Sequence, residues 1–183
     1  MDAPACEHHP WPEFRPVTES TWEGVLAENW ATGAPELTWS VYFDGYPDGR
    51  SGVEFHIESI PFTVSSWREL EGARAECEEF GEPIEAYLFD GEHSNFDYVR
   101  IEVLRQSGAT VRFAIDLAWC EVDRVKVESA EDEWADIDRL RVVVDAEFQG
   151  VTVRTPNHRL ADFIDTTGLV FDASHDVYRP SGE

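Results

Sequence analysis

The chain has 183 residues, 42% of them apolar and 13% aromatic, and its 38 acidic against 14 basic side chains give a formal net charge of −24. This length suits a single domain, and the aromatic content excludes a disordered acidic tail, because such tails lack the apolar surface that folding must bury. The acid excess disfavours nucleic acid and anionic lipid as partners, since both require clustered Lys and Arg.

The three cysteines are far apart and odd in number, at Cys6, Cys77 and Cys120. This arrangement predicts neither a disulfide framework nor a paired zinc site, and it favours reduced thiols in a cytoplasm. The first residues lack the basic and apolar regions of a signal peptide, and no apolar run approaches the roughly 20 residues that span a bilayer. We therefore expect a cytoplasmic protein without membrane association.

Residues 1–19 are rich in proline and predict an irregular lead-in. Ser20 and Glu23 then have the spacing of a capping box, in which each side chain satisfies a backbone N–H at a helix start. Apolar residues follow at helical spacing from Trp22 to Trp30, and a glycine follows three positions later. The pattern predicts a short amphipathic helix over 21–31.

A second capping-box pair, Ser66 and Glu69, precedes another stripe of apolar residues that runs from Trp67 through Cys77. This pattern predicts a helix over 66–80 in which Cys77 is a buried, inert thiol. Asn157 is placed to cap a third and last helix.

The rest of the chain alternates apolar and polar residues in segments that are separated by turn-forming residues. Segments of this kind predict strands at 37–43, 52–59, 84–90, 96–105, 109–118, 120–128, 140–148, 151–154 and 169–171. The acidic segment 129–139 interrupts the pattern, and the tail 180–183 reads as frayed. Together these elements predict a single α+β domain over 1–183, with a twisted, mainly antiparallel sheet of about seven to nine strands, open or partly closed, and about three short helices.

The sequence offers little for catalysis or metal binding. Small clusters of potential ligands occur at Cys6–His9, at Asp90 with His93, and at Asp172 with His175, but each also fits a polar turn or a loose terminus. No zinc, calcium, phosphate-binding or nucleophile motif is present. His56, between Glu54 and Glu58, is expected on the solvated face of its strand. We therefore expect no metal or cofactor, and the sequence leans away from an enzyme.

The acidic residues concentrate in two places. One is the predicted helix 66–80 and its end, with Glu71, Glu78, Glu79 and Glu82; the other surrounds Trp134, with Glu131, Asp132, Glu133, Asp136 and Asp138. Carboxylates around an aromatic anchor form a pattern suited to binding a basic protein. These ten residues are therefore the predicted partner-binding site.

The resulting hypothesis is a non-catalytic acidic binding protein, such as an inhibitor or an immunity or anti-defence protein, which neutralises a basic effector such as a toxin or nuclease. Size and charge alone suggest this function, and no family motif is recognised. A small enzyme or ligand-binding domain that uses the concave face of the sheet is one alternative. A salt-adapted domain whose charge has no partner is another. The identity of the partner and the oligomeric state stay open.

Overall fold

The computed structural model describes residues 20–45, 53–89, 91–119, 139–155 and 157–181. Within these ranges ten strands form one sheet, accompanied by a single turn of 3₁₀ helix. The elements are β1 (Ser20–Glu28), β2 (Pro35–Asp44), β3 (Glu54–Ile60), β4 (Arg74–Cys77), β5 (Glu85–Phe89), β6 (His93–Ser107), β7 (Thr110–Trp119), β8 (Arg139–Val153), η1 (Leu160–Asp162), β9 (Leu169–Asp172) and β10 (Val177–Pro180).

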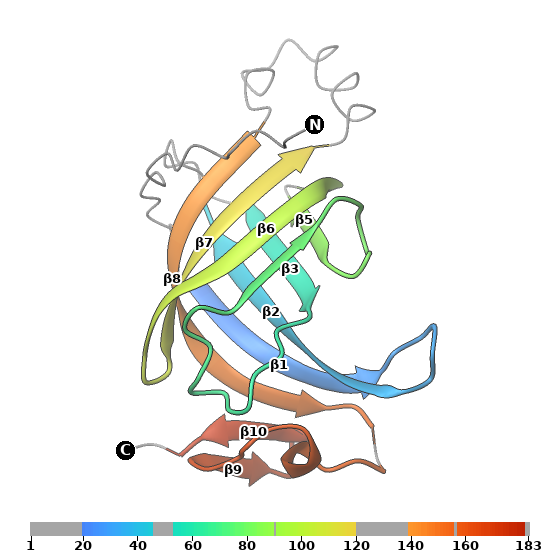
Figure 1. Cartoon of the computed structure of the whole chain (residues 1–183), viewed down its shortest axis with the longest axis vertical. Helices are drawn as coiled ribbons and strands as arrows, with labels where there is room; N and C mark the ends of the chain where they lie inside the picture. The colour runs from blue at the N-terminus through green and yellow to red at the C-terminus, as the bar shows by residue number, and fades with distance from the viewer. Residues whose placement is uncertain (1–19, 46–52, 90, 120–138, 156, 182–183) are drawn as a thin grey trace, which may run out of the picture.

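The sheet closes on itself. Its strands follow the order β1-β2-β3-β5-β6-β7-β8, and β8 then pairs with β1, so that these seven strands form a ring (Figure 1). Every strand pairing is antiparallel except the closing one between β1 and β8, which is parallel with Ser20 opposite Ala146. Closure removes the exposed edges that an open sheet of this length would present.

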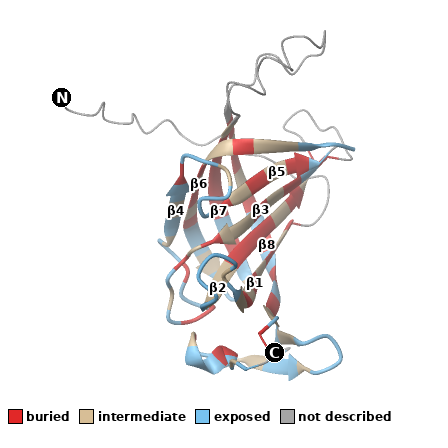
Figure 2. Cartoon of the chain, turned by 90° about the vertical axis from the view of Figure 1, so that its right-hand side faces the viewer, coloured by how far each residue is buried: buried red, intermediate tan, exposed pale blue. Residues whose placement is uncertain are grey.

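The interior of the ring is filled by the side chains of alternate residues along each strand. Buried and more exposed positions alternate along the strands, as the period of two requires (Figure 2). Trp22 lies at the centre, with its ring 4.2 Å from that of Phe148 and 5.5 Å from that of Trp39. Its indole N–H donates to the carbonyl oxygen of Ala109 at 3.0 Å.

The connection from β3 to β4 covers one end of this interior. Trp67 lies on this connection, is buried, and stacks on Phe148 with ring centroids 4.8 Å apart. Its indole N–H donates to the carbonyl oxygen of Thr167 at 3.1 Å, and a parallel bridge joins Ser66 to Asp165. The connection is thereby tied to the segment before β9.

The short hairpin of β9 and β10 extends the sheet from β8 below the ring (Figure 1). β7 pairs with β8 as far as Glu147, and β10 pairs with β8 at Val151 and Thr152. Gly150 lies at this change of partner with φ of +122°. The conformation is one that residues with a side chain rarely adopt.

The prediction of an α+β fold with three helices is wrong. The described residues contain no α-helix, and the predicted helix 21–31 is strand β1 followed by a turn. Trp22 and Leu26 point into the core while Glu23 and Val25 are half-exposed, which is a period of two rather than 3.6. Backbone pairing with β2 on one side and β8 on the other satisfies the N–H groups that a capping box would have satisfied.

The predicted helix 66–80 is also wrong. Ser66 and Glu69 shape a turn, in which the Ser66 Oγ accepts from the backbone N–H of Arg68 at 3.2 Å and Glu69 accepts from Ser65 Oγ at 2.6 Å. Gly72, with φ of +82°, ends the turn, and the chain continues into the extended strand β4. Cys77 is buried as predicted but lies on this strand, and burial raises the pKa of its thiol. The third predicted helix is reduced to η1.

The strand predictions fare better. The segments 37–43, 84–90, 96–105, 109–118 and 169–171 correspond to β2, β5, β6, β7 and β9, and 52–59 corresponds to β3. The segments 140–148 and 151–154 are one continuous strand, β8, and the sequence pattern does not predict β10. The lead-in 1–19, the predicted strand 120–128, almost all of the insert 129–139 and the end of the tail lie outside the described residues.

Candidate functional site

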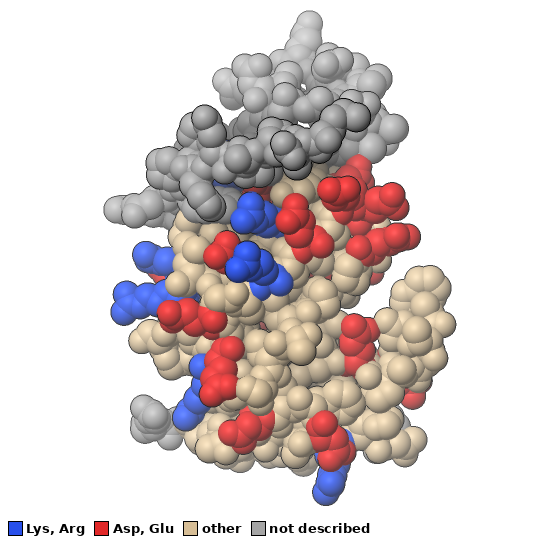
Figure 3. Space-filling view, in the orientation of Figure 1, with Lys and Arg blue, Asp and Glu red and all other residues tan. Residues whose placement is uncertain are grey.

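Charge divides the ring into two halves. Strands β1, β2, β3 and β5, which are adjacent, contain no Lys or Arg, and their acidic residues are Glu23, Glu28, Glu36, Asp44, Glu54, Glu58 and Glu85. Strands β6, β7 and β8 instead carry as many arginines as acids, with Arg100, Arg105, Arg112, Arg139 and Arg141 beside Asp97, Glu102, Asp116, Asp145 and Glu147. Figure 3 shows basic and acidic side chains interleaved at the left and centre, and acidic ones alone at the upper right.

On the acidic half, a row of aromatic side chains crosses the outer face of the sheet. Tyr42 on β2, His56 on β3 and Tyr87 on β5 lie directly opposite one another. The His56 ring meets that of Tyr42 edge to face at 5.1 Å and stacks on that of Tyr87 at 4.8 Å. The row continues from Tyr87 to His93 on β6 at 4.9 Å, and Phe89 contacts His93 at 5.1 Å. We call these five residues the aromatic ladder.

The ladder lies on the outer face of the sheet because its neighbours along each strand are buried in the core. The residues that flank the ladder positions on β2, β3 and β5, such as Val41, Phe55 and Leu88, are buried in the interior. Because side chains alternate between faces, their neighbours must point outward. The rings then cover one another, so that the His56 side chain is only 24% exposed.

Carboxylates surround the ladder. The Tyr42 hydroxyl donates to Glu23 Oε1 and the Tyr87 hydroxyl donates to Glu58 Oε1, both at 3.3 Å. His56 lies between two more carboxylate contacts, with Nε2 3.5 Å from Glu54 and Nδ1 3.7 Å from Glu58. We call the ladder with Glu23, Glu54 and Glu58 the aromatic–carboxylate face.

Burial at this face alters the titration of its groups. Desolvation raises the pKa of Tyr42 and of Tyr87, and the nearby charge of Glu58 adds to the effect in both. Both phenols are therefore held in the protonated state, as hydrogen-bond donors to the carboxylates. Burial also raises the pKa of Glu23, against the hydrogen bond from Tyr42 and the charge of Arg154, which lower it.

The face has the chemistry of a cation-binding surface. Each carboxylate has lone pairs beyond those that the tyrosine and histidine contacts use, and these can accept N–H groups from a guanidinium or ammonium. The packed rings supply a rigid apolar surface for the methylene stem of an Arg or Lys side chain.

Only part of the site predicted from sequence lies in the described residues. Glu71, Glu78, Glu79 and Glu82 are exposed, but they do not share a helix face. Glu71 accepts from the backbone N–H of Gln106 at 3.0 Å, and the other three lie in the turns between β4 and β5. Trp134 and the five acids around it, Glu131, Asp132, Glu133, Asp136 and Asp138, lie outside the described residues, as do Cys6–His9 and Asp90.

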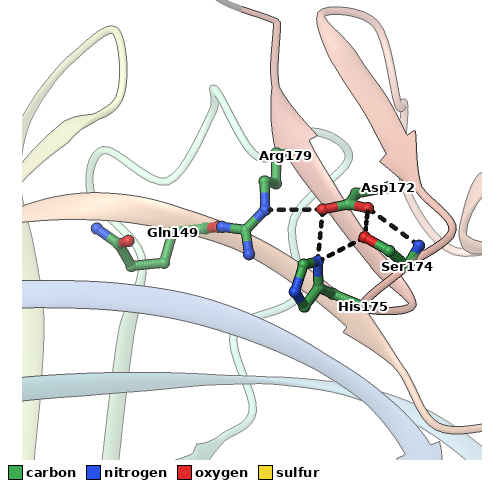
Figure 4. Close-up of polar contacts among 5 residues, drawn as sticks. All are labelled: Gln149, Asp172, Ser174, His175 and Arg179. Atoms are coloured by element: carbon green, nitrogen blue, oxygen red, sulfur yellow. Dashed lines mark hydrogen bonds and ion pairs between the residues drawn. The ribbon is translucent and has the colours of Figure 1, made fainter.

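The cluster at Asp172 is a hydrogen-bonded turn (Figure 4). Asp172 Oδ1 accepts from the backbone N–H of Ser174 at 3.0 Å and from its hydroxyl at 2.5 Å, and Oδ2 lies 2.8 Å from His175 Nδ1. Arg179 approaches the same carboxylate at 3.6 Å and donates to the carbonyl oxygen of Gln149 at 3.4 Å. The serine, histidine and aspartate are close neighbours in one solvent-accessible turn, so they stabilise the β9–β10 hairpin, and the hydrogen bonds from Ser174 and His175 lower the pKa of Asp172.

Sequence reasoning placed Glu54, His56 and Glu58 of the aromatic–carboxylate face together on one strand, but it did not connect them with the members on other strands. The alternation of Glu54, His56 and Glu58 placed the histidine on the outer face, and this is where it lies. Its ring partners Tyr42 and Tyr87 come from neighbouring strands, and only the register of the sheet brings them together.

Comparisons of the chain with protein-family models, with curated proteins and with solved structures find no match, so its function has to be inferred from the site itself. Among the described residues, no three His, Cys, Asp or Glu side chains are grouped so that they could hold a metal ion. In the same part of the chain, no helix has the length and apolar character needed to cross a membrane.

Proposed function

We propose that this chain is an acidic binding protein that captures a basic protein partner through its aromatic–carboxylate face. One observation carries the proposal: the packed row of Tyr42, His56 and Tyr87 is surrounded by carboxylates on strands that contain no Lys or Arg. An inhibitor or immunity protein that neutralises a basic toxin or nuclease is the form of this function that best fits the charge of the chain.

Electrostatics supports fast capture of such a partner. A net charge of −24 attracts a cationic protein over several ångströms and raises the association rate, most strongly at low salt. Since β6, β7 and β8 balance their acids with arginines, the strongest attraction is expected over β1, β2, β3 and β5, the residues of which include no Lys or Arg. Charge therefore also favours one orientation of the partner.

Packing supports tight binding after the encounter. Tyrosine is enriched among the residues that dominate binding energy, because it buries a large area while losing few rotatable bonds. Tyr87 is already held by its stack on His56 and by its hydrogen bond to Glu58, so that little further ordering is required. An arginine of the partner would lay its stem on the rings and donate to Glu54 and Glu58.

The concave face is a weaker candidate for binding. Most of the side chains that point into the ring are apolar and pack on one another, as Phe43 does on Phe55 with ring centroids 4.8 Å apart. Nothing in this packing favours a ligand inside the sheet over a partner outside it.

The test is calorimetric titration of the purified chain with an oligoarginine peptide, using two matched pairs of variants. Tyr87→Ala and Glu58→Gln alter the face. Tyr98→Ala and Glu147→Gln are the matched controls, and both lie away from the face. The Tyr98 hydroxyl donates to Glu76 at 2.9 Å. The Glu147 carboxylate accepts from Thr110 at 2.8 Å. Glu58→Gln and Glu147→Gln change the net charge equally, so that long-range attraction is matched.

We expect the variants of the face to bind at least about five-fold more weakly than wild type, with the two controls within about two-fold of it. Equal weakening by Glu58→Gln and Glu147→Gln would mean that only overall charge matters, and the proposal would be wrong. The proposal that the partner is a toxin or nuclease is tested in two steps. A basic protein that is recovered with the wild-type chain should be lost with the Tyr87→Ala, Glu58→Gln double variant. The activity of that basic protein should be inhibited by the wild-type chain.

A further inference from the structure

The tip of the β1–β2 hairpin exposes a tryptophan almost completely. Trp30 is 94% exposed, whereas Trp22, Trp39 and Trp67 are buried. The hairpin projects beyond the body of the ring at the right of Figure 1. An indole is among the largest apolar groups a protein carries and is usually mostly buried, so its presentation at the end of a projecting hairpin requires an explanation.

The turn that carries Trp30 is held by its own hydrogen bonds. Asn29 Oδ1 accepts from the backbone N–H groups of Ala31 and Thr32 at 2.9 and 3.1 Å, and the Asn29 carbonyl accepts from Gly33 at 2.7 Å. The N–H of Ala34 donates to Thr32 Oγ1 at 3.2 Å. Four consecutive backbone N–H groups of the tip are thus satisfied within it, so the turn does not need a contact from Trp30 to keep its shape.

A side-chain contact fixes the base of the same turn. The Asn29 Nδ2 group donates to Glu36 Oε2 at 2.8 Å, which links the end of β1 to the start of β2. Because the backbone around Trp30 is already ordered, a partner that binds the indole would lose little entropy in ordering the loop.

The charges around the tip select the kind of partner. Glu28 and Glu36 flank the turn, and neither β1 nor β2 contains Lys or Arg. An anionic membrane and a second copy of the chain, which also carries −24, would both be repelled. A guanidinium is attracted by these carboxylates, and tryptophan is the best aromatic ring for a cation–π contact.

We propose that Trp30 is a second anchor for the same basic protein partner, and that it receives an arginine of that partner on its exposed indole. This inference rests on the proposed function. Tyr42 follows Pro35 by seven positions along β2, which at a rise of about 3.3 Å per residue separates the hairpin from the ladder by roughly 23 Å. An interface of about 800 Å² per partner, the size usual for specific complexes, is roughly 30 Å across and spans both.

Two arginine peptides test the inference. A single cluster of three arginines can reach one anchor at a time. Two such clusters joined by a Gly-Ser linker of about 16 residues have a mean span near 22 Å and can reach both. Each peptide is titrated against wild type, Trp30→Ala, Trp30→Phe and Tyr87→Ala, with Leu104→Ala as the control for loss of an exposed apolar side chain on β6.

We expect Trp30→Ala to weaken the two-cluster peptide about three-fold or more, with Trp30→Phe in between and Leu104→Ala unchanged. The indole N–H signal of Trp30 in ¹H–¹⁵N spectra, identified by its absence in Trp30→Phe, should shift when this peptide is added. Unchanged affinity in Trp30→Ala, or a Trp30 signal that does not move, overturns the second anchor. If Trp30→Ala has no effect while Tyr87→Ala weakens both peptides, only the second anchor fails; if Tyr87→Ala affects neither, the proposed function itself fails.

Discussion

The main chain of Tyr178 passes so close to Gly150 that a methyl group on Gly150 would overlap the Tyr178 carbonyl oxygen. The same methyl group would lie 2.9 Å from Val177 Cγ1. This approach allows β10 to take the place of β7 beside β8, and so attaches the β9–β10 hairpin to the ring.

Gly150→Ala is therefore expected to destabilise the protein through both backbone strain and overlap. Gly91 separates the two effects, because it also has positive φ, +112°, but a methyl group on it would have no neighbour within 4 Å among the described residues. We expect Gly91→Ala to cost about 1–2 kcal/mol in free energy of unfolding and Gly150→Ala at least about 2 kcal/mol more. Urea unfolding measures both. Equal costs would show that β10 does not need the close approach.

Arg112 on β7 and Asp145 on β8 form a bidentate ion pair across the two strands. The Arg112 Nε and Nη2 groups donate to the two carboxylate oxygens at 2.9 and 2.6 Å. The side chains are 48% and 52% exposed, so solvent screens the pair, and a double-mutant cycle with Arg112→Ala and Asp145→Ala should give about 0.2–1 kcal/mol of coupling at neutral pH.

The same pair predicts a pH dependence with a definite sign. The hydrogen bond from Arg112 lowers the pKa of Asp145 in the folded state. The stabilisation is therefore complete above the unfolded pKa of about 3.9 and is lost as the pH falls through the lower folded value. The coupling measured at pH 7 should therefore shrink as the pH falls below about 3.9. Coupling that does not change over this range would have to come from packing of the side chains.

The strands were predictable because alternation of apolar and polar residues is a local signal. The helices were mispredicted because the spacing that suggested them is ambiguous. Trp22, Leu26 and Trp30 are four positions apart, which fits one face of a helix and equally one face of a strand, since four is a multiple of two. What decided the outcome was pairing with β8, more than 120 positions away in sequence, which no local pattern reveals.

The candidate site was predictable only in part, for the same reason. The acidic character of the protein and the outward position of His56 follow from composition and alternation. The ladder depends on which residue of β2 and which of β5 lies opposite His56, and a shift of one residue in either register would turn its tyrosine inward. The sequence hypothesis therefore favoured acidic residues that are neighbours along the chain rather than across strands.

Glu23 predicts a pH dependence of opposite sign to that of Asp145. Burial raises its folded pKa, so the folded state binds more protons than the unfolded state between the unfolded value of about 4.3 and the raised folded value. This contribution to stability is present below the unfolded pKa and is lost as the pH rises through the folded pKa. Relative to Glu23→Gln, the wild type should be most stable near pH 4 and lose ground towards pH 7. Urea unfolding at both pH values measures this, and a difference that grows in favour of wild type at pH 7 would contradict it.

Substitutions of Trp22 and Trp30 should differ most in their effect on stability. The helix prediction placed both residues on one apolar stripe. In the structure Trp22 is buried in the core and Trp30 is exposed at the hairpin tip. Trp22→Phe removes the hydrogen bond to Ala109 and leaves a cavity against Phe148, which should cost about 2 kcal/mol. Trp30→Phe changes a side chain in contact with solvent and should alter the free energy of unfolding by less than about 0.5 kcal/mol. Thermal and urea unfolding of the two variants side by side provide the measurement. A cost near about 2 kcal/mol for Trp30→Phe as well would mean that its indole is buried, which would contradict the exposed tip and the second anchor.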